Sequence, residues 1–166
     1  MGLKNIPDEM WPPIGEAKEM AQVFENAGRY EEAIVKYKEA ITLLPAPAEQ
    51  WEQVRYLWLS LGEVNLKMKN YEEALEFYKK VMRLPPSGVF YMGNYHVYMA
   101  EAYYGLNDME KARYELLYAY LDNGKRTINY YATTKSLAKK YLKLIEPEIT
   151  DPTLLAGYSR DNYQIP

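Results

Sequence analysis

The sequence predicts an all-α fold built from a repeated pair of helices. Three observations support this prediction: a segment that recurs along the chain, apolar residues spaced as on one face of a helix, and glycine or proline near the ends of each recurring segment. The 166 residues are 48% hydrophobic and 26% charged, which suits a packed core rather than a disordered chain. The length fits one short repeat array.

The recurring segment is clearest in two copies, GRYEEAIVKYKEAI at 28–41 and KNYEEALEFYKKVM at 69–82, which align without a gap. A weaker third copy, NDMEKARYELLYAY, lies at 107–120. In each copy, apolar and aromatic residues recur at intervals that place them on one helical stripe. Small residues on this stripe let a neighbouring helix approach, and larger ones fill the space beside them. In the first copy the stripe consists of Tyr30, Ala33, Tyr37 and Ala40.

Glycine and proline mark the boundaries of these helices. Gly28 ends the helix before the first copy by allowing a left-handed turn, and Pro45 stops the helix that the copy forms. Pro86 occupies the equivalent place after the second copy, and Gly124 after the third. Another amphipathic stretch precedes each copy, so we expect helix, short turn and helix three times over. These stretches span residues 15–26, 48–68 and 89–105.

This pattern resembles the tetratricopeptide repeat, a helix–turn–helix unit of about 34 residues. The chain departs from the family at Ala17 and His96, where the family prefers tryptophan. The resemblance covers about residues 14–124. The matching residues have the size, small or bulky, that the family pattern requires at their positions. They are Met20, Ala21, Phe24, Ala33, Tyr37, Ala40 and Pro45 in the first unit; Trp58, Leu61, Gly62, Ala74, Tyr78 and Pro86 in the second; and Met99, Ala100, Tyr103, Ala112 and Ala119 in the third.

The resemblance implies an all-α, right-handed superhelical array of three such units with a C-terminal capping helix. We place the seventh helix at 129–145, and we expect the tail either to pack as a short helical turn or to stay mobile. The expected parts of the chain are a lead-in at 1–13, repeats at 14–124 divided into 14–46, 48–86 and 87–124, a capping helix within 125–147 and a tail at 148–166.

The spacing of the repeats is uneven. It is 41 residues from Ala33 to Ala74 and 38 residues from Ala74 to Ala112, both longer than the family period. The extra residues lie before Trp58 and before His96. We therefore expect longer first helices in the second and third units, or longer connections leading into them.

In the family, the first helix of each unit lines a concave face that binds protein or peptide segments. We predict a groove from the helix face beside the core stripe. The alternative is that these residues pack against the tail or against the lengthened first helices that form one rim of the array. The predicted groove residues are Lys18 and Gln22, joined by Glu25, in unit one; Tyr56, Leu59, Glu63, Leu66 and Lys67 in unit two; Asn94, Val97, Tyr98, Glu101 and Tyr104 in unit three; and Lys135 on the capping helix.

Composition argues against several kinds of chemistry. The chain has no cysteine, which removes disulfides and thiolate metal sites, and one histidine, which rules out a two-histidine metal site within one chain. We expect His96 to be a half-buried packing residue. No nucleophile or phosphate-loop motif is present. We therefore predict no catalytic residue, no cofactor and no metal, and a protein that is not an enzyme.

Charge and the absence of targeting signals narrow the partners. A net charge of −3 gives no general attraction to nucleic acid. No signal-peptide core or long apolar run occurs, so we expect a cytoplasmic protein that does not use a membrane. In the family's chaperone-binding members a carboxylate clamp grips a terminal carboxylate; here only Lys18 matches it, so we predict no such clamp.

These observations favour an adaptor or scaffold that binds a protein or peptide in its groove. Two alternatives stay open. One is a dedicated immunity protein or chaperone that neutralises a specific effector. The other is a self-assembling structural protein, a weak homo-oligomer in which the basic segment 123–145 meets the acidic segment 1–63, which carries eleven acids and six bases.

Overall fold

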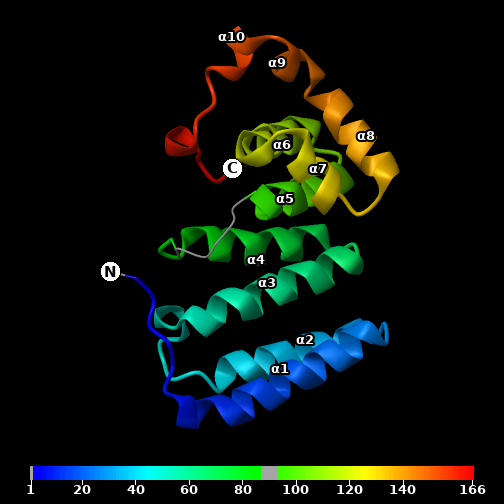
Figure 1. Ribbon diagram of the computed structural model, residues 1–166. Helices are drawn as coiled ribbons and strands as arrows, with labels where there is room; N and C mark the ends of the chain where they lie inside the picture. The colour runs from blue at the N-terminus through cyan, green and yellow to red at the C-terminus, as the bar shows by residue number, and fades with distance from the viewer. Residues whose placement is uncertain (1, 87–92) are drawn as a thin grey trace. The chain divides into compact units, whose positions relative to one another are not determined.

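The computed structural model describes residues 2–86 and 93–166, where the chain folds mainly into helices, which confirms the all-α prediction (Figure 1). The chain divides into two compact units, Met1–Val89 and Phe90–Pro166. No helix in the described ranges is both long and apolar enough to cross a membrane. The first unit contains η1 (Asp8–Met10), α1 (Trp11–Asn26), α2 (Tyr30–Thr42), η2 (Ala48–Gln50), α3 (Glu52–Lys67) and α4 (Tyr71–Arg83). The second contains α5 (Gly93–Gly105), α6 (Met109–Asn123), α7 (Lys125–Tyr131), α8 (Lys135–Leu144), α9 (Glu146–Thr150), α10 (Pro152–Leu155) and η3 (Arg160–Asn162).

Consecutive helices pack as pairs. In the first unit α1 packs on α2, α3 packs on α4, and α2 also contacts α3; in the second unit α5 packs on α6. Ala33, Ala74 and Ala112, on the second helix of the three pairs, are completely buried. The stripe of small residues therefore faces the interior, as the sequence predicts.

The turn inside each pair uses the same backbone conformation. Gly28, Lys69 and Asn107 hold equivalent positions and have φ angles of 73°, 61° and 62°. Only glycine adopts this left-handed conformation without a steric penalty. The sequence indicates the turn at Gly28, while at Lys69 the turn forms in spite of the residue type.

The first unit accommodates its extra residues in a connection and not in a longer helix. Both α1 and α3 contain 16 residues, and the added length lies at 43–51, around η2. The lead-in packs on this connection: the Lys4 amide donates to the Gln50 carbonyl at 2.9 Å, and the Glu52 amide donates to the Lys4 carbonyl at 2.8 Å. The start of the third expected stretch, at 89, falls among residues 87–92, outside the described part of the chain.

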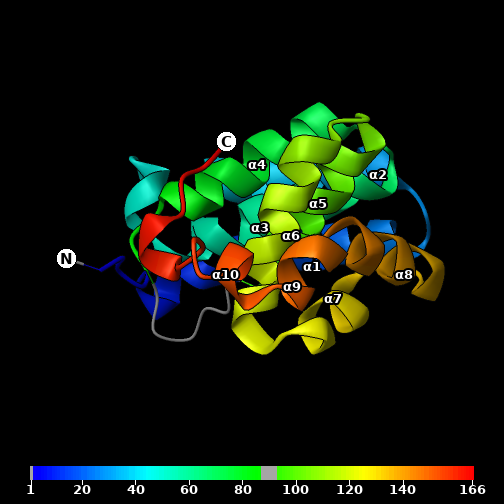
Figure 2. The same cartoon turned by 90° about the horizontal axis from the view of Figure 1, so that it is seen from above.

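The predicted capping helix is wrong in its extent, because two helices occupy its place. In Figures 1 and 2, α7 and α8 are separate, and they contact each other and α6. The Thr134 side chain accepts a hydrogen bond from the Leu137 amide and so begins α8 afresh. Ile128 of α7 and Tyr141 of α8 are completely buried and join one core with residues of α5 and α6.

The tail packs in short helical turns. It forms α9, α10 and η3, and then returns to α5 and α6. The Tyr118 hydroxyl donates to Asn162 Oδ1 at 2.6 Å, and the Tyr103 hydroxyl donates to the Pro166 carbonyl at 3.4 Å. Of the two expected states of the tail, the packed one is observed.

Gly62→Ala tests the closeness of α3 and α4. A Cβ at this position would lie 2.6 Å from Cε1 of Tyr78, inside the normal contact distance. The clash outweighs the better helix propensity of alanine, so we expect the free energy of unfolding of the first unit to fall by about 1 kcal/mol. Urea denaturation followed by circular dichroism measures the change.

The matched control is the same substitution in a Tyr78→Leu background, where the ring is gone. There Gly62→Ala should be neutral or stabilising. Equal losses in the two backgrounds would show that the ring does not set the helix spacing.

Candidate functional site

A polar hollow of about 410 Å³ opens in the first unit between α1 and α3. It brings together two of the predicted groove residues, Gln22 and Glu63, with Glu25, which the sequence also places on this face. The remaining members, Asn26, Tyr37 and Ser60, are not among the predicted groove residues, and the repeat pattern gives Tyr37 a packing role alone. The hollow, called the acidic hollow below, is lined by Gln22, Glu25, Asn26, Tyr37, Ser60 and Glu63.

Helical spacing explains why these side chains converge. Ser60, Glu63 and Lys67 are separated by three and four residues, which places them on one face of α3. Gln22, Glu25 and Asn26 are related in the same way on α1. The repeat pattern explains only the packing of the Tyr37 ring on α2; the signal for a second role is its hydroxyl, which needs a polar partner when the ring is buried.

Glu25 is fully engaged inside the first unit. Lys67 Nζ donates to Glu25 Oε1 at 2.6 Å, an ion pair that joins α3 to α1. The hydroxyl of the buried Tyr37 donates to Glu25 Oε2 at 2.8 Å. Burial and the Glu25 carboxylate raise the pKa of Tyr37, so this hydroxyl stays a donor at neutral pH. Both oxygens of Glu25 therefore have partners.

Glu63 is in a different state. Burial raises the pKa of its carboxyl, the charge of Glu25 raises it further, and Lys67 lowers it in part. Within the described part of the chain, no ion pair or hydrogen bond holds this carboxylate. The hollow thus contains one half-buried acidic group with a satisfied acidic neighbour and no cation of its own.

The other predicted groove residues of the first unit do not line the hollow. Tyr56 lies on the same stripe of α3 as Ser60, one turn earlier, and is 45% exposed. Lys18 is half-buried, with Nζ 6.0 Å from the centre of the Trp11 ring. Leu59 and Leu66 are also half-buried.

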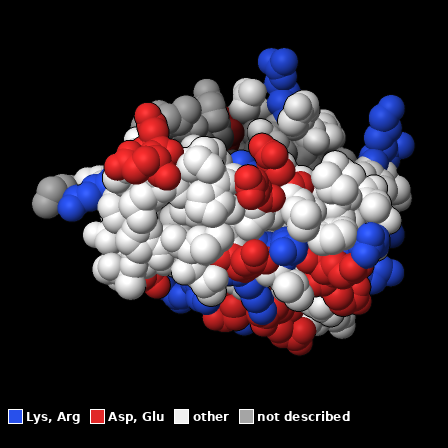
Figure 3. All heavy atoms as spheres, turned by 90° about the horizontal axis from the view of Figure 1, so that it is seen from below, with Lys and Arg blue, Asp and Glu red and all other residues white. Residues whose placement is uncertain are grey.

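Charge on the surface around these helices is mixed. Figure 3 views the molecule from the side where α1 lies in Figure 1, and it shows groups of acidic side chains with basic ones between them. At the start of α2 and along it, Arg29 pairs with Glu32, and Lys36 pairs with Glu39 at 2.6 Å. The exposed acids of α2 are thus partly neutralised by neighbours, unlike Glu63.

In the second unit, later helices engage the predicted groove residues. The Tyr98 and Tyr104 rings meet Tyr131 of α7 and Tyr141 of α8 edge-on, with centroids 6.1 and 5.5 Å apart. The Thr133 hydroxyl donates to the Glu101 carboxylate at 2.6 Å. Burial raises the pKa of Glu101, and this hydrogen bond lowers it in part. These side chains therefore contact α7, α8 and the link between them.

One groove prediction in this unit is wrong. Val97 is completely buried in the core formed with α6, α7 and α8, so it has no surface to offer a partner. The prediction fails because α7 packs on α5 and covers the face on which Val97 lies. Lys135 is exposed in the first turn of α8, and the Asn94 side chain accepts from the Tyr95 amide at 3.0 Å.

His96 is more buried than the sequence suggested and is held by a carboxylate. Its side chain is 7% exposed, and Nδ1 lies 2.6 Å from Glu115 Oε2. Glu115 is completely buried. This arrangement agrees with a packing histidine, although its partner on α6 could not be identified from the repeat pattern.

Comparison with known proteins agrees with this architecture. Residues 14–87 match the family model of the tetratricopeptide repeat, a range that begins within α1 and extends past α4. A solved structure titled "MamA RS-1 ArsTM double mutant" is similar in fold, with 17% sequence identity and a TM-score of 0.58, over 90% of this chain and 78% of that one. No curated protein matches the chain. Repeats of this family generally mediate protein–protein interaction and are typically not catalytic. Residues 14–87 of the chain are therefore tetratricopeptide repeats.

Proposed function

We propose that the first unit is a protein-binding module whose acidic hollow receives a lysine or arginine side chain from an extended partner segment. The observation that carries this proposal is the half-buried Glu63 carboxylate, which forms no ion pair with any cation in the described part of the chain, in a polar hollow of about 410 Å³. A partner with this chemistry supplies what the hollow lacks.

The electrostatics favour a positive guest. A carboxylate that has lost part of its hydration is destabilised unless a hydrogen-bond donor or a positive charge replaces the water. Lys67 lowers the pKa of Glu63, but its ammonium group is bound to Glu25. An arriving ammonium or guanidinium group would form a charge-assisted hydrogen bond with Glu63, stronger than a bond between neutral groups.

The surroundings suit a segment rather than a free ion. Tyr56 is exposed one helical turn from Ser60, and offers an aromatic surface to a neighbouring residue of the same segment. The hollow is lined by side chains of three helices that pack on one another, α1, α2 and α3, so these side chains are held before binding and less entropy is lost on association. We therefore propose an adaptor or scaffold role for the unit.

Binding of a basic peptide tests this function. The probes are random nonapeptides on an array with lysine or arginine fixed at the centre, and the same set with glutamate there. We expect the chain to retain a subset of the basic probes. Affinity for these, measured by fluorescence anisotropy, should fall about tenfold in Glu63→Gln, because a hydrogen bond between charged groups is lost.

Glu76→Gln is the matched control, since Glu76 is an exposed carboxylate on α4 of the same unit. It should bind the retained probes like the unchanged chain. Tyr56→Ala should weaken them by a smaller factor. Retention of the glutamate set, or equal affinity in Glu63→Gln, would remove the proposed role of the acidic hollow.

Stability against pH gives a second test that needs no ligand. The folded pKa of Glu63 is raised above its model value of 4.5, so ionisation is disfavoured in the folded state. The resulting penalty is absent below the unfolded pKa, grows as pH rises through the raised folded pKa, and is constant above it. Glu63→Gln should therefore be more stable than the unchanged chain at pH 7, with a smaller advantage at pH 4.

Urea unfolding at intervals between pH 4 and 8 measures this difference. Glu76→Gln serves again as the control and should give the same offset at every pH. A Glu63→Gln curve that runs parallel to that of the unchanged chain would show that Glu63 carries no buried charge in the free protein.

A further inference from the structure

The C-terminal segment inserts one aromatic side chain between α5 and α6. The Tyr163 ring meets His96 edge-on with centroids 4.6 Å apart, meets Tyr118 edge-on at 4.8 Å, and stacks on Tyr114 at 5.7 Å. These three rings together with Glu115 form what we call the tyrosine pocket. The segment that fills it, residues 158–166, is called the tail segment.

The base of the tyrosine pocket is a completely buried carboxylate. The Tyr163 hydroxyl donates to Glu115 Oε1 at 2.7 Å, while His96 Nδ1 lies 2.6 Å from Oε2. Burial and the charge of Glu115 raise the pKa of Tyr163, which keeps the hydroxyl protonated. Without this hydroxyl, one oxygen of a buried acid would lose its donor, which is costly in a protein interior. The pocket therefore selects a ring that carries a donor.

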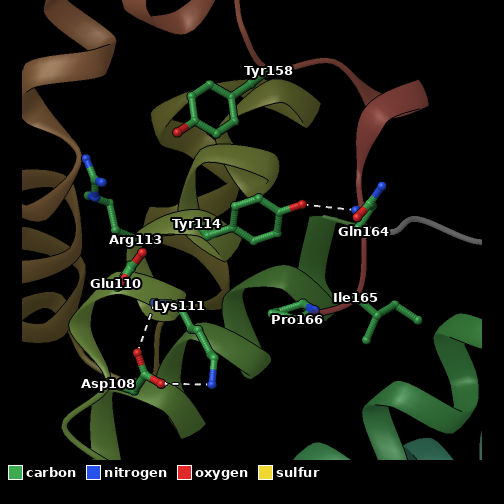
Figure 4. A pocket seen from close by; sticks show the side chains of 9 residues that line it. All are labelled: Asp108, Glu110, Lys111, Arg113, Tyr114, Tyr158, Gln164, Ile165 and Pro166. Atoms are coloured by element: carbon green, nitrogen blue, oxygen red, sulfur yellow. Dashed lines mark hydrogen bonds and ion pairs between the residues drawn. The ribbon is translucent and has the colours of Figure 1, made fainter.

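Outside this ring the tail segment makes a small number of contacts: the Tyr158 ring meets Tyr118 edge-on at 5.8 Å, Arg160 pairs with Asp122 at 3.1 Å, and the Pro166 carbonyl accepts from Tyr103 at 3.4 Å. Residues 159–162 are exposed. The Gln164 amide donates to the Tyr114 hydroxyl at 3.0 Å, and Asn162 accepts from Tyr118 at 2.6 Å. A hollow of about 610 Å³ remains between the segment and the start of α6, with Lys111 and Arg113 on one side and Gln164 on the other (Figure 4). Segments with few buried apolar contacts open more readily than the core.

We propose that the tyrosine pocket is a recognition site for a tyrosine in an extended segment of a partner protein, and that the tail segment occupies it as a built-in competitor. The bound segment itself defines the chemistry of the partner. Its tyrosine has extended backbone, with φ −65° and ψ 133°, and the next residue offers a free amide to Tyr114. A partner therefore presents tyrosine followed by a residue other than proline.

Competition follows from the tether. A segment attached to its own binding site acts at an effective concentration in the millimolar range, so a free peptide of equal intrinsic affinity binds the intact chain weakly. A change that loosens the tail segment increases the fraction of chains whose pocket is empty, and the apparent affinity for a free peptide rises in proportion to that fraction. This site lies in the second unit, and its test is independent of the acidic hollow in the first.

The test uses the full chain and a labelled synthetic peptide of residues 157–166 as the probe. In Tyr163→Ala the tail segment no longer fills the pocket. We expect this variant to bind the probe saturably and at least about tenfold more tightly than the unchanged chain, as read by fluorescence anisotropy. A probe with phenylalanine in place of Tyr163 should bind the variant about tenfold more weakly, because it cannot donate to Glu115.

Asn162→Ala provides a second receptor that leaves the pocket intact. It removes the acceptor of the Tyr118 hydroxyl and an exposed cap of η3, and it should bind the probe more tightly than the unchanged chain. Tyr130→Ala is the matched control, since that ring is 81% exposed on α7; its probe affinity should equal that of the unchanged chain.

Two results would overturn the proposal. One is probe binding no tighter in Asn162→Ala than in the unchanged chain, with the helical circular dichroism signal of both intact. The other is equal binding of the tyrosine and phenylalanine probes. Light scattering of the unchanged chain adds a further outcome: a dimer that the probe dissociates would assign the pocket to the tail segment of a second copy, contradicting the partner proposed here.

Discussion

One contact sets the spacing of α3 and α4 in the first unit: a tyrosine ring packs directly against the helix backbone at a glycine. At Gly62 the backbone of α3 lies so close to Tyr78 that even a methyl group would overlap the ring. Ala21 and Tyr37 hold the equivalent positions in α1 and α2, and both are buried. Since the Tyr37 hydroxyl also bonds to Glu25, the residue that packs this pair also orients a carboxylate of the acidic hollow. Core packing and the site therefore depend on the same side chain.

The two units treat their inner carboxylates differently. Glu115 is completely buried, and both its oxygens have partners within the second unit. Glu63 is only partly buried and lacks such partners in the described chain. A buried acid without a partner lowers stability, whereas a paired one fixes the groups around it. The structure thus contains one carboxylate whose donor the chain supplies and another whose donor must come from solvent or from a guest.

The sequence predicts the helix pairs well because their signals are local. The Ala33 and Ala74 stripes, the turn at Gly28 and the acids in the first turns of α2 and α4 all lie within one helix or beside it. Val97 could not be placed correctly in this way. It lies on the face that the repeat pattern leaves open, and only the packing of α7 and α8 on α5 turns that face into core.

The acidic hollow was predictable in part and the tyrosine pocket was not. Helical spacing places Gln22, Glu25 and Glu63 on the inner faces of α1 and α3, but it says nothing of which acid Lys67 engages. The pocket joins Tyr163 to Glu115, 48 residues earlier in the chain, through a segment with no helical period. The remaining signal was compositional: tyrosines recur on α6 and in the tail, in excess of what the repeat requires.

Two parts of the second unit cover α5 and α6, namely the helices α7 and α8 and the tail segment, and the free energy needed to displace them differs. Helices α7 and α8 carry Ile128 and Tyr141 into the core without any exposed surface, and Ile145 follows them there. Burial of each such side chain contributes roughly 1.5–3 kcal/mol, so lifting these helices would disrupt the whole unit. The tail segment contributes the partly buried rings of Tyr158 and Tyr163, an ion pair from Arg160 to Asp122, a few hydrogen bonds and a run of exposed residues beside a hollow. Its release therefore requires far less free energy, and it uncovers polar groups that another tyrosine can satisfy. The element that covers the tyrosine pocket is thus one whose release would leave the core of the unit packed.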